Sequence, residues 1–133
     1  MDINKAKILI CDDSILARKQ LKDVIFTIGQ PNVFEAKDGS ESVELYKKEQ
    51  PDLVFLDIVM PKFDGKEVLK QILDVNANAK IVIVSSIGTR EVLLEAIKLG
   101  AIDFIQKPFT ELQIINAISK SFSQVTNCYL SRY

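Results

Sequence analysis

The sequence predicts an α/β fold in which a doubly wound, five-stranded parallel sheet is covered by five helices. Two observations support this fold: short apolar runs of strand length recur along the chain, and the segments between them place apolar residues at helical spacing. Continuous apolar runs are typical of strands that are buried on both faces, as in a parallel sheet. Strands that alternate with helices require right-handed crossovers, which place helices on both faces of the sheet.

Five segments have the composition of buried strands. Four are almost entirely apolar, and residues 33–36 form a weaker fifth candidate. In chain order, the predicted strands cover residues 8–11, 33–36, 53–56, 81–84 and 102–105.

The first two helical segments stop at residues that do not continue a helix, and a third helical segment follows. The first ends at Gly29 and Pro31, the second covers residues 40–49 and stops before Pro51, and the third covers residues 64–76. The core face of the first helix is predicted to hold Ala17, Leu21, Val24, Ile25 and Ile28. The third helix is predicted to bury Val68, Leu69, Ile72 and Leu73.

The last two helical segments begin at threonines. The fourth follows Thr89 and closes at Gly100, a residue that is common just beyond a helix end. The fifth begins at Thr110, which has the spacing of a capping box with Gln113. The fourth helix is predicted to place together Val92, Leu93, Ala96 and Ile97. The fifth is predicted to direct toward the core Leu112, Ile115, Ile118 and Phe122.

The composition is that of one ordinary globular domain. The chain has 133 residues, 47% hydrophobic and 26% charged, which is close to the commonest size for a single domain. We expect this domain to cover residues 1–125 and a short tail to cover residues 126–133. The net charge of -1 gives no bias toward nucleic acid or an anionic membrane.

The chain lacks the sequence signals of export and of membrane insertion. Its apolar stretches fall far short of the roughly 20 residues of a membrane span, and its first residues lack the apolar core of a secretory signal. We therefore expect a cytoplasmic protein. Cys11, in an apolar run, and Cys128, near the end, are expected to be inert reduced thiols.

Polar residues follow four of the predicted strands. They are Asp12 and Asp13, Asp57, Ser85 and Ser86, and the pair Lys107-Pro108. Taken singly, each has an ordinary explanation, because such residues often cap the next helix or remain solvated. Taken together, they predict a site, since doubly wound sheets bind ligands beyond the carboxyl ends of their strands.

The three aspartates carry more charge than their neighbours can balance. Carboxylates at ~4 Å repel one another by about 4 kcal/mol at an effective dielectric constant of 20, and all three would be ionised at neutral pH. Lys107 supplies one positive charge. A hard divalent cation, Mg²⁺ or Mn²⁺, would remove the surplus, and magnesium commonly bridges protein oxygens to phosphate. The expected ligand therefore carries phosphate.

The same strand ends resemble those of the receiver domain of two-component signalling. The similarity spans residues 7 to 123, and its motifs occur in the expected order. The motifs are Cys11-Asp12-Asp13-Ser14, Leu56-Asp57-Ile58-Val59-Met60-Pro61 with Asp64-Gly65, Val84-Ser85-Ser86, and Asp103-Phe104-Ile105-Gln106-Lys107-Pro108-Phe109. The resemblance implies a flavodoxin-like fold with strand order 2-1-3-4-5 and a phosphorylation-dependent signalling switch rather than an enzyme.

The resemblance also implies how a phosphoryl group would be received. A histidine kinase or phosphotransfer protein would present a phosphohistidine, and Asp57 would accept its phosphoryl group; the chain itself contains no histidine. Asp13, Asp57 and the backbone carbonyl of Val59 would bind the metal directly, and Asp12 would bind it through a water molecule. Lys107 would contact a phosphoryl oxygen.

Further residues match the switch of the family. Ser85 would hydrogen-bond the phosphoryl group, and Phe104 would move between exposed and buried positions, altering the face formed by the fourth helix, fifth strand and fifth helix. The bond before Pro108 would be cis. Val59 and Ile87 stand where the family tunes the attacking water, and both are apolar here. We therefore expect slow autodephosphorylation.

Other classes with related chemistry fit less well. Haloacid-dehalogenase phosphatases also use a strand-end aspartate, but they need a second aspartate where this chain has Val59. A flavodoxin-like flavin site would require a Ser/Thr/Gly-rich loop in place of Asp12-Asp13, and no P-loop motif is present.

The output of the switch has two interpretations. The motifs favour a stand-alone chemotaxis-type regulator, whose target could be a flagellar motor switch. The alternative is a receiver domain excised from a longer regulator, for example a DNA-binding one. In either case we expect no direct contact with nucleic acid or membrane, and the protein would be a monomer or a phosphorylation-dependent dimer.

Overall fold

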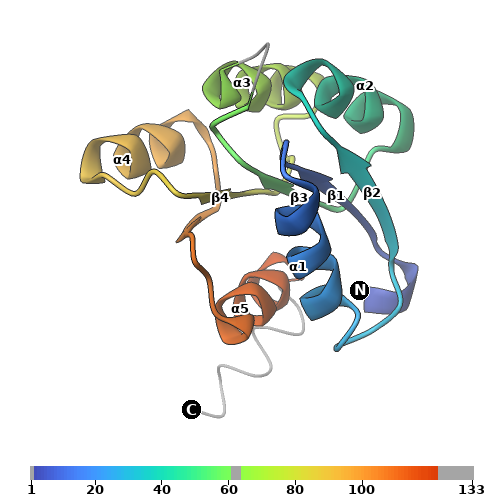
Figure 1. The fold of residues 1–133 in the computed structure, drawn as a ribbon. Coiled ribbons are helices and arrows are strands. Elements are labelled where there is room, and N and C mark those ends of the chain that lie inside the picture. Colours follow the sequence, from blue (N-terminus) through green and yellow to red (C-terminus); the bar gives the residue numbers. More distant parts are fainter. Residues whose placement is uncertain (1, 61–63, 123–133) are drawn as a thin grey trace.

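A computed structural model describes residues 2–60 and 64–122 of the chain. It contains a five-stranded sheet in the order β2-β1-β3-β4-β5 (Figure 1), and all four strand pairs are parallel. The strands are β1 (Lys7–Cys11), β2 (Asn32–Ala36), β3 (Leu53–Leu56), β4 (Ile81–Ser85) and β5 (Asp103–Gln106). The helices are α1 (Ile15–Ile25), α2 (Gly39–Glu49), α3 (Gly65–Val75), α4 (Arg90–Leu99) and α5 (Glu111–Ser121), preceded by the short 3-10 helix η1 (Ile3–Lys5). The predicted fold class and strand order are confirmed.

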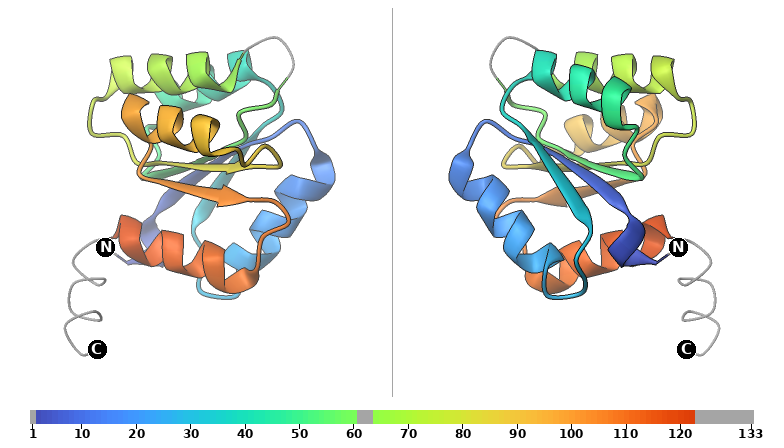
Figure 2. Two further views of the ribbon diagram at one scale, coloured as in Figure 1. Left: turned by 90° about the vertical axis from the view of Figure 1, so that its left-hand side faces the viewer. Right: turned by 90° about the vertical axis from the view of Figure 1, so that its right-hand side faces the viewer.

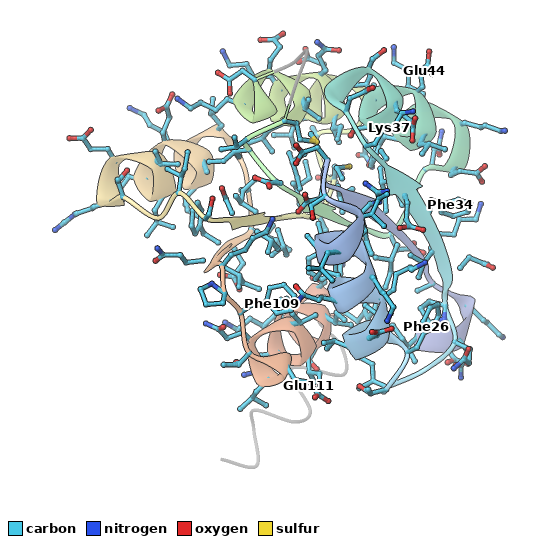
Figure 3. All side chains as sticks on the ribbon, viewed as in Figure 1. Phe26, Phe34, Lys37, Glu44, Phe109 and Glu111 are labelled. Carbon is cyan, nitrogen blue, oxygen red and sulfur yellow. The ribbon has the colours of Figure 1, made fainter. Side chains whose placement is uncertain are left out.

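Helices cover both faces of the sheet. α2, α3 and α4 lie on one face, and α1 and α5 lie on the other (Figure 2). Alternate residues of one strand enter two separate apolar clusters: Leu9 of β1 packs with residues of α2, α3 and α4, whereas Ile8 and Ile10 pack with α1 and α5. Phe109, in the loop before α5, packs against the second cluster (Figure 3). Burial on both faces explains why the strand sequences are continuously apolar.

The strand register brings the polar strand ends together. Cys11 of β1 pairs with Leu56 of β3, and the N–H of Asp57 donates to the carbonyl of Cys11 at 2.8 Å. The residues that follow β1 and β3 therefore leave the sheet side by side. On the far side of β3, the N–H of Lys107 donates to the carbonyl of Ser85 at 2.8 Å, which fixes the ends of β4 and β5 in the same way.

Side-chain caps begin the helices where the sequence predicts them. Thr89 caps α4 and Gly100 follows its end. Thr110 and Gln113 form the predicted capping box, in which each side chain accepts a hydrogen bond from the backbone N–H of the other. Asp38 and Asp64 also cap the helices that follow them, α2 and α3.

The predicted core faces of the last two helices are partly wrong. Leu112 of α5 is 64% exposed, whereas Ile114 is buried. The buried stripe of α5 consists of Ile114, Ala117, Ile118 and Ser121. Small and polar members made this stripe hard to recognise; Ser121 tolerates burial because its hydroxyl donates to the carbonyl of Ala117 at 2.7 Å. On α4, Ile97 is exposed rather than buried.

Two expectations concern the termini and the membrane. The predicted tail, residues 126–133, and Cys128 within it lie outside the described residues. Among the residues that the structure describes, no helix is both long enough and apolar enough to span a membrane.

Cys11 is buried, and burial raises the pKa of its thiol to about 12, as expected for an inert cysteine.

Gly65 allows α3 to begin directly against the segment that follows β3. Its N–H donates to the carbonyl of Ile58 at 3.1 Å. A Cβ atom at this position would overlap the backbone of Ile58, which cannot move aside as a flexible side chain can. Ile58, the residue after Asp57, is therefore held in place by a contact that only glycine permits.

We predict that Gly65→Ala destabilises the protein by about 2 kcal/mol or more, because overpacking against backbone forces a local rearrangement. Gly88→Ala is the matched control, since its added Cβ would meet the amide end of the flexible Gln106 side chain, and we expect it to change stability by less than about 1 kcal/mol. Urea unfolding followed by circular dichroism would measure both. Equal effects of the two substitutions would contradict the special role of Gly65.

Candidate functional site

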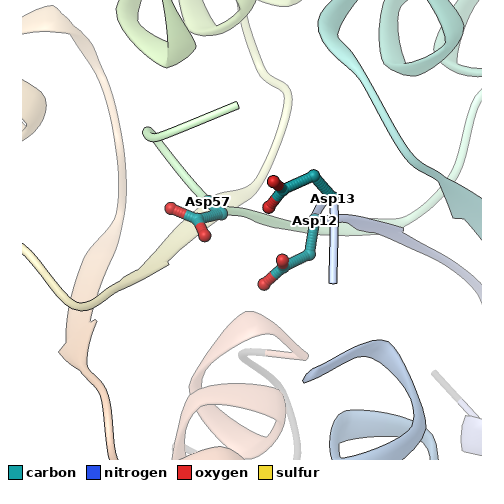
Figure 4. A group of neighbouring side chains, drawn as sticks. All are labelled: Asp12, Asp13 and Asp57. Atoms are coloured by element: carbon teal, nitrogen blue, oxygen red, sulfur yellow. The ribbon is translucent and has the colours of Figure 1, made fainter. Parts of the chain in front are cut away.

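Three carboxylates gather where β1 and β3 end. Asp12 and Asp13 follow β1 and Asp57 follows β3, and one carboxylate oxygen of each lies within 4.8 Å of the others (Figure 4). Asp12 and Asp57 are buried, with 2% and 6% of their surfaces exposed, whereas Asp13 is exposed. The predicted acidic cluster therefore forms, and it opens to solvent on the side of Asp13.

Each of the two buried carboxylates is held by the same pair of contacts. One oxygen accepts a backbone N–H two residues later: Asp12 Oδ1 from Ser14 at 2.9 Å, and Asp57 Oδ1 from Val59 at 2.9 Å. The other oxygen faces Lys107, whose Nζ lies 2.6 Å from Asp12 Oδ2 and 3.1 Å from Asp57 Oδ2. Both carboxylates are therefore oriented before any ligand arrives.

Lys107 reaches the carboxylates from the end of β5. The peptide bond between Lys107 and Pro108 is cis, as the family resemblance implies. Burial lowers the pKa of Lys107, but its hydrogen bonds to Asp12 and Asp57 outweigh burial and hold the pKa above its ordinary value. The ammonium group therefore stays charged at neutral pH.

Asp57 is the carboxylate of the cluster whose pKa is raised. Burial raises the pKa of its carboxyl above the ordinary value, and the charge of Asp12 adds to this effect. The Val59 N–H and the Lys107 ammonium act in the opposite direction without reversing it. The ionised form of Asp57 is therefore less favourable here than in a solvent-exposed aspartate.

The donor set fits a hard divalent cation. Three carboxylates face one close ammonium group in this cluster, so negative charge remains in excess. Carboxylate and carbonyl oxygens are the ligands that Mg²⁺ prefers, and Mg²⁺ is commonly bound by one or two carboxylates together with water and phosphate. The exposed side of Asp13 leaves room for such additional ligands.

The other predicted site residues have contacts of their own. Ser85 is buried, and its Oγ accepts the N–H of Ile87 at 3.2 Å; among the described residues, no hydrogen bond joins Ser85 to the three carboxylates. The side chains of Val59 and Ile87 are both exposed. Phe104 is partly buried and packs against the apolar cluster that lies between the sheet and helices α2, α3 and α4.

Sequence reasoning missed Arg18. Its Nη1 donates to the backbone carbonyl of Asp12 at 2.6 Å, and its Nε lies 3.1 Å from Glu35 Oε1 on β2. Nothing in the sequence separates Arg18 from the other cations of the same helix. Its position on the helix face turned toward β2 could have been a signal only once the sheet order was known.

Comparisons with known proteins agree with this geometry. The family model described as the response regulator receiver domain matches residues 8–119. The chain is 42% identical over 114 residues to the chemotaxis protein CheY of Thermotoga maritima, covering 86% of this chain and 95% of the relative. It is 41% identical over 117 residues to CheY of Bacillus subtilis, covering 88% and 98%.

A solved structure shows the same relationship. The fold superposes with a TM-score of 0.84 and 33% identity on a chain of the CheX-CheY-BeF3-Mg complex from Borrelia burgdorferi, covering 88% of this chain and 89% of that one. The match to the family model extends over most of the chain and includes the acidic cluster and all strand residues except Lys7 at the start of β1. The chain therefore belongs to the response regulator receiver domain family and is a phosphorylation switch of two-component signalling, homologous to the CheY chemotaxis regulators.

Proposed function

We propose that Asp57 is the residue that receives the phosphoryl group in this switch. The observation that carries the proposal is its placement: Asp57 lies at the end of β3, 3.1 Å from the ammonium of Lys107 and within the reach of Asp12 and Asp13. One carboxylate oxygen is tied to the backbone of Val59, so the other, on the Lys107 side, is the natural nucleophile. Lys107 is then placed to contact an oxygen of the incoming group.

The transfer balances without a further reactant. A carboxylate oxygen of Asp57 attacks the phosphorus of a partner's phosphohistidine, a P–O bond forms, and the P–N bond breaks. The departing imidazole retains the electron pair of that bond and takes up a proton on the partner. Positioning and charge stabilisation are most of what phosphoryl transfer requires of a protein, and Lys107 supplies both to the equatorial oxygens.

Receiver domains generally bind magnesium, and we assign this chain's ligands from its own donors. Asp13 and Asp57 would bind the ion directly with the backbone carbonyl of Val59, and Asp12 would bind it through water. When bound, Mg²⁺ would neutralise excess carboxylate charge and the charge of the phosphoryl group. The indirect role of Asp12 follows the family resemblance; its two oxygens accept hydrogen bonds from the Ser14 N–H and from Lys107.

The signal would leave through α4, β5 and α5. Ser85 would exchange its bond to the Ile87 N–H for one to the phosphoryl group, drawing the loop before α4 toward Asp57. Phe104, which is only partly buried, could then move further inward. A change of this kind would alter the α4–β5–α5 face and thereby the affinity for a downstream protein.

A chemotaxis role is supported by the relatives. Both relatives described above are chemotaxis proteins that this chain covers almost end to end, and the Borrelia structure holds its CheY together with CheX. We propose a histidine kinase or phosphotransfer protein as donor and a chemotaxis component as target. Membership in the receiver family also decides against the dehalogenase-type phosphatase.

Val59 and Ile87 would set the lifetime of the phosphorylated state. Both side chains are exposed beside the site, and neither can orient a water molecule by hydrogen bonding. They would shield the acyl phosphate, so we propose slow autodephosphorylation.

The acceptor assignment predicts a specific modification. Incubation with acetyl phosphate and Mg²⁺ should add one phosphoryl group to the wild type and none to Asp57→Asn, measured by intact mass. Asp23→Asn, which changes an exposed aspartate of α1, should be modified like the wild type. A phosphoryl gain in Asp57→Asn, or none in the wild type, would refute the assignment.

The pKa of Asp57 predicts a pH-dependent stability. A carboxyl whose pKa is raised by folding stabilises the native state below its ordinary pKa and loses that contribution as the pH rises through the folded-state pKa. In metal-free buffer at pH 7, Asp57→Asn should therefore have a higher thermal midpoint than the wild type, because the variant removes a carboxylate whose ionised form is disfavoured by burial and by Asp12. The difference should shrink as the pH falls toward 4. If the wild type were as stable as the variant at pH 7, the raised pKa of Asp57 would be contradicted.

The lifetime proposal is tested by the decay of phosphorylated protein. After removal of the phosphodonor, the wild type should decay over minutes or longer, and Val59→Asn should decay at least about threefold faster because an amide can orient water. Val59→Leu is the apolar control and should decay like the wild type. A wild-type lifetime of seconds would exclude shielding.

A further inference from the structure

Arg18 links the acidic cluster to β2, the outer strand of the sheet. It lies on α1, and only 12% of its side chain is exposed. Its Nη1 donates to the carbonyl of Asp12 at 2.6 Å, and its Nε lies 3.1 Å from Glu35 Oε1. One planar guanidinium thus makes two directed contacts, to the backbone of the site and to β2.

Glu35 is the anchor at the other end of this link. Its second oxygen, Oε2, accepts from Lys22 Nζ at 3.1 Å. Burial raises the pKa of Glu35, but the bonds from Lys22 and Arg18 outweigh burial and leave the pKa below its ordinary value. Glu35 is therefore charged at neutral pH and holds two cations of α1.

The backbone of Asp12 is fixed on both sides by these neighbours. Its N–H donates to the carbonyl of Ala36 on β2 at 3.0 Å, and its carbonyl accepts from Arg18. Both contacts lead to β2, where Ala36 directly follows Glu35 in the strand. The peptide between Asp12 and Asp13 contains the carbonyl that Arg18 holds, so the orientation of this peptide determines where both carboxylates point.

We propose that Arg18 is a positioning residue for the cation site and that Glu35 is its anchor. Arg18 fixes the peptide between Asp12 and Asp13, so that both carboxylates converge on Asp57 before the cation arrives. Neither residue touches the cation or the phosphoryl group. The geometry requires arginine, because a lysine ammonium cannot present two coplanar donors at a fixed angle.

This inference rests on the proposed magnesium site, and its test measures binding rather than phosphorylation. Residues that orient metal ligands typically change metal affinity by 10-fold or more when substituted. We expect Arg18→Lys and Glu35→Gln each to weaken Mg²⁺ binding by about tenfold, measured by isothermal titration calorimetry. Lys19→Ala is the matched control: it breaks the exposed pair between Lys19 and Asp23 on the same helix and should leave the affinity within about twofold.

The double variant distinguishes positioning from a general loss of stability. If both residues act through one link, Arg18→Lys combined with Glu35→Gln should weaken Mg²⁺ binding no more than either single change. The thermal midpoint of each metal-free variant would be recorded alongside. Unchanged Mg²⁺ affinity in both single variants, even with a lowered midpoint, would overturn the proposal, as would fully multiplicative losses in the double variant. If the wild type does not bind Mg²⁺, the proposed magnesium site is itself refuted.

Discussion

The chemistry of this site depends on electrostatic repulsion among three carboxylates at the carboxyl ends of β1 and β3. Asp12, Asp13 and Asp57 lie within 4.8 Å of one another, and the close ammonium of Lys107 compensates only part of their charge. Two of the three are buried, so water cannot screen them well. The site is therefore poised to gain a cation and, through it, a phosphoryl group.

The fold produces this repulsion and restrains it. Parallel strands that are buried on both faces place the aspartates together at their carboxyl ends, and the close contact of Gly65 with Ile58 holds the residue that follows Asp57. Backbone N–H groups of Ser14 and Val59 fix one oxygen of each buried carboxylate. Arg18 and Glu35 extend the same restraint to the outer strand. A receiver built this way holds an excess of negative charge that a bound divalent cation can relieve.

Local signals in the sequence predicted the strands, the caps of α4 and α5 and the acidic cluster. The sheet order was implied by the resemblance to receiver domains. Apolar runs identified the strands, and aspartates at their ends identified the edge. Two features depended on tertiary packing and were not predictable. The buried face of α5 includes Ala117 and Ser121, which look like surface residues until packing is known. Arg18 resembles the other cations of α1, and its contacts with the Asp12 carbonyl and Glu35 become evident only in the folded structure.

The charge state of Asp57 is the most direct test of this account. Its side-chain carboxyl can be followed by ¹³C NMR during a pH titration, with Asp57→Asn identifying the signal. The account predicts a midpoint above the ordinary range without metal and a clear fall when Mg²⁺ is saturating, because the cation favours the ionised form. A midpoint in the ordinary range that does not respond to Mg²⁺ would contradict it.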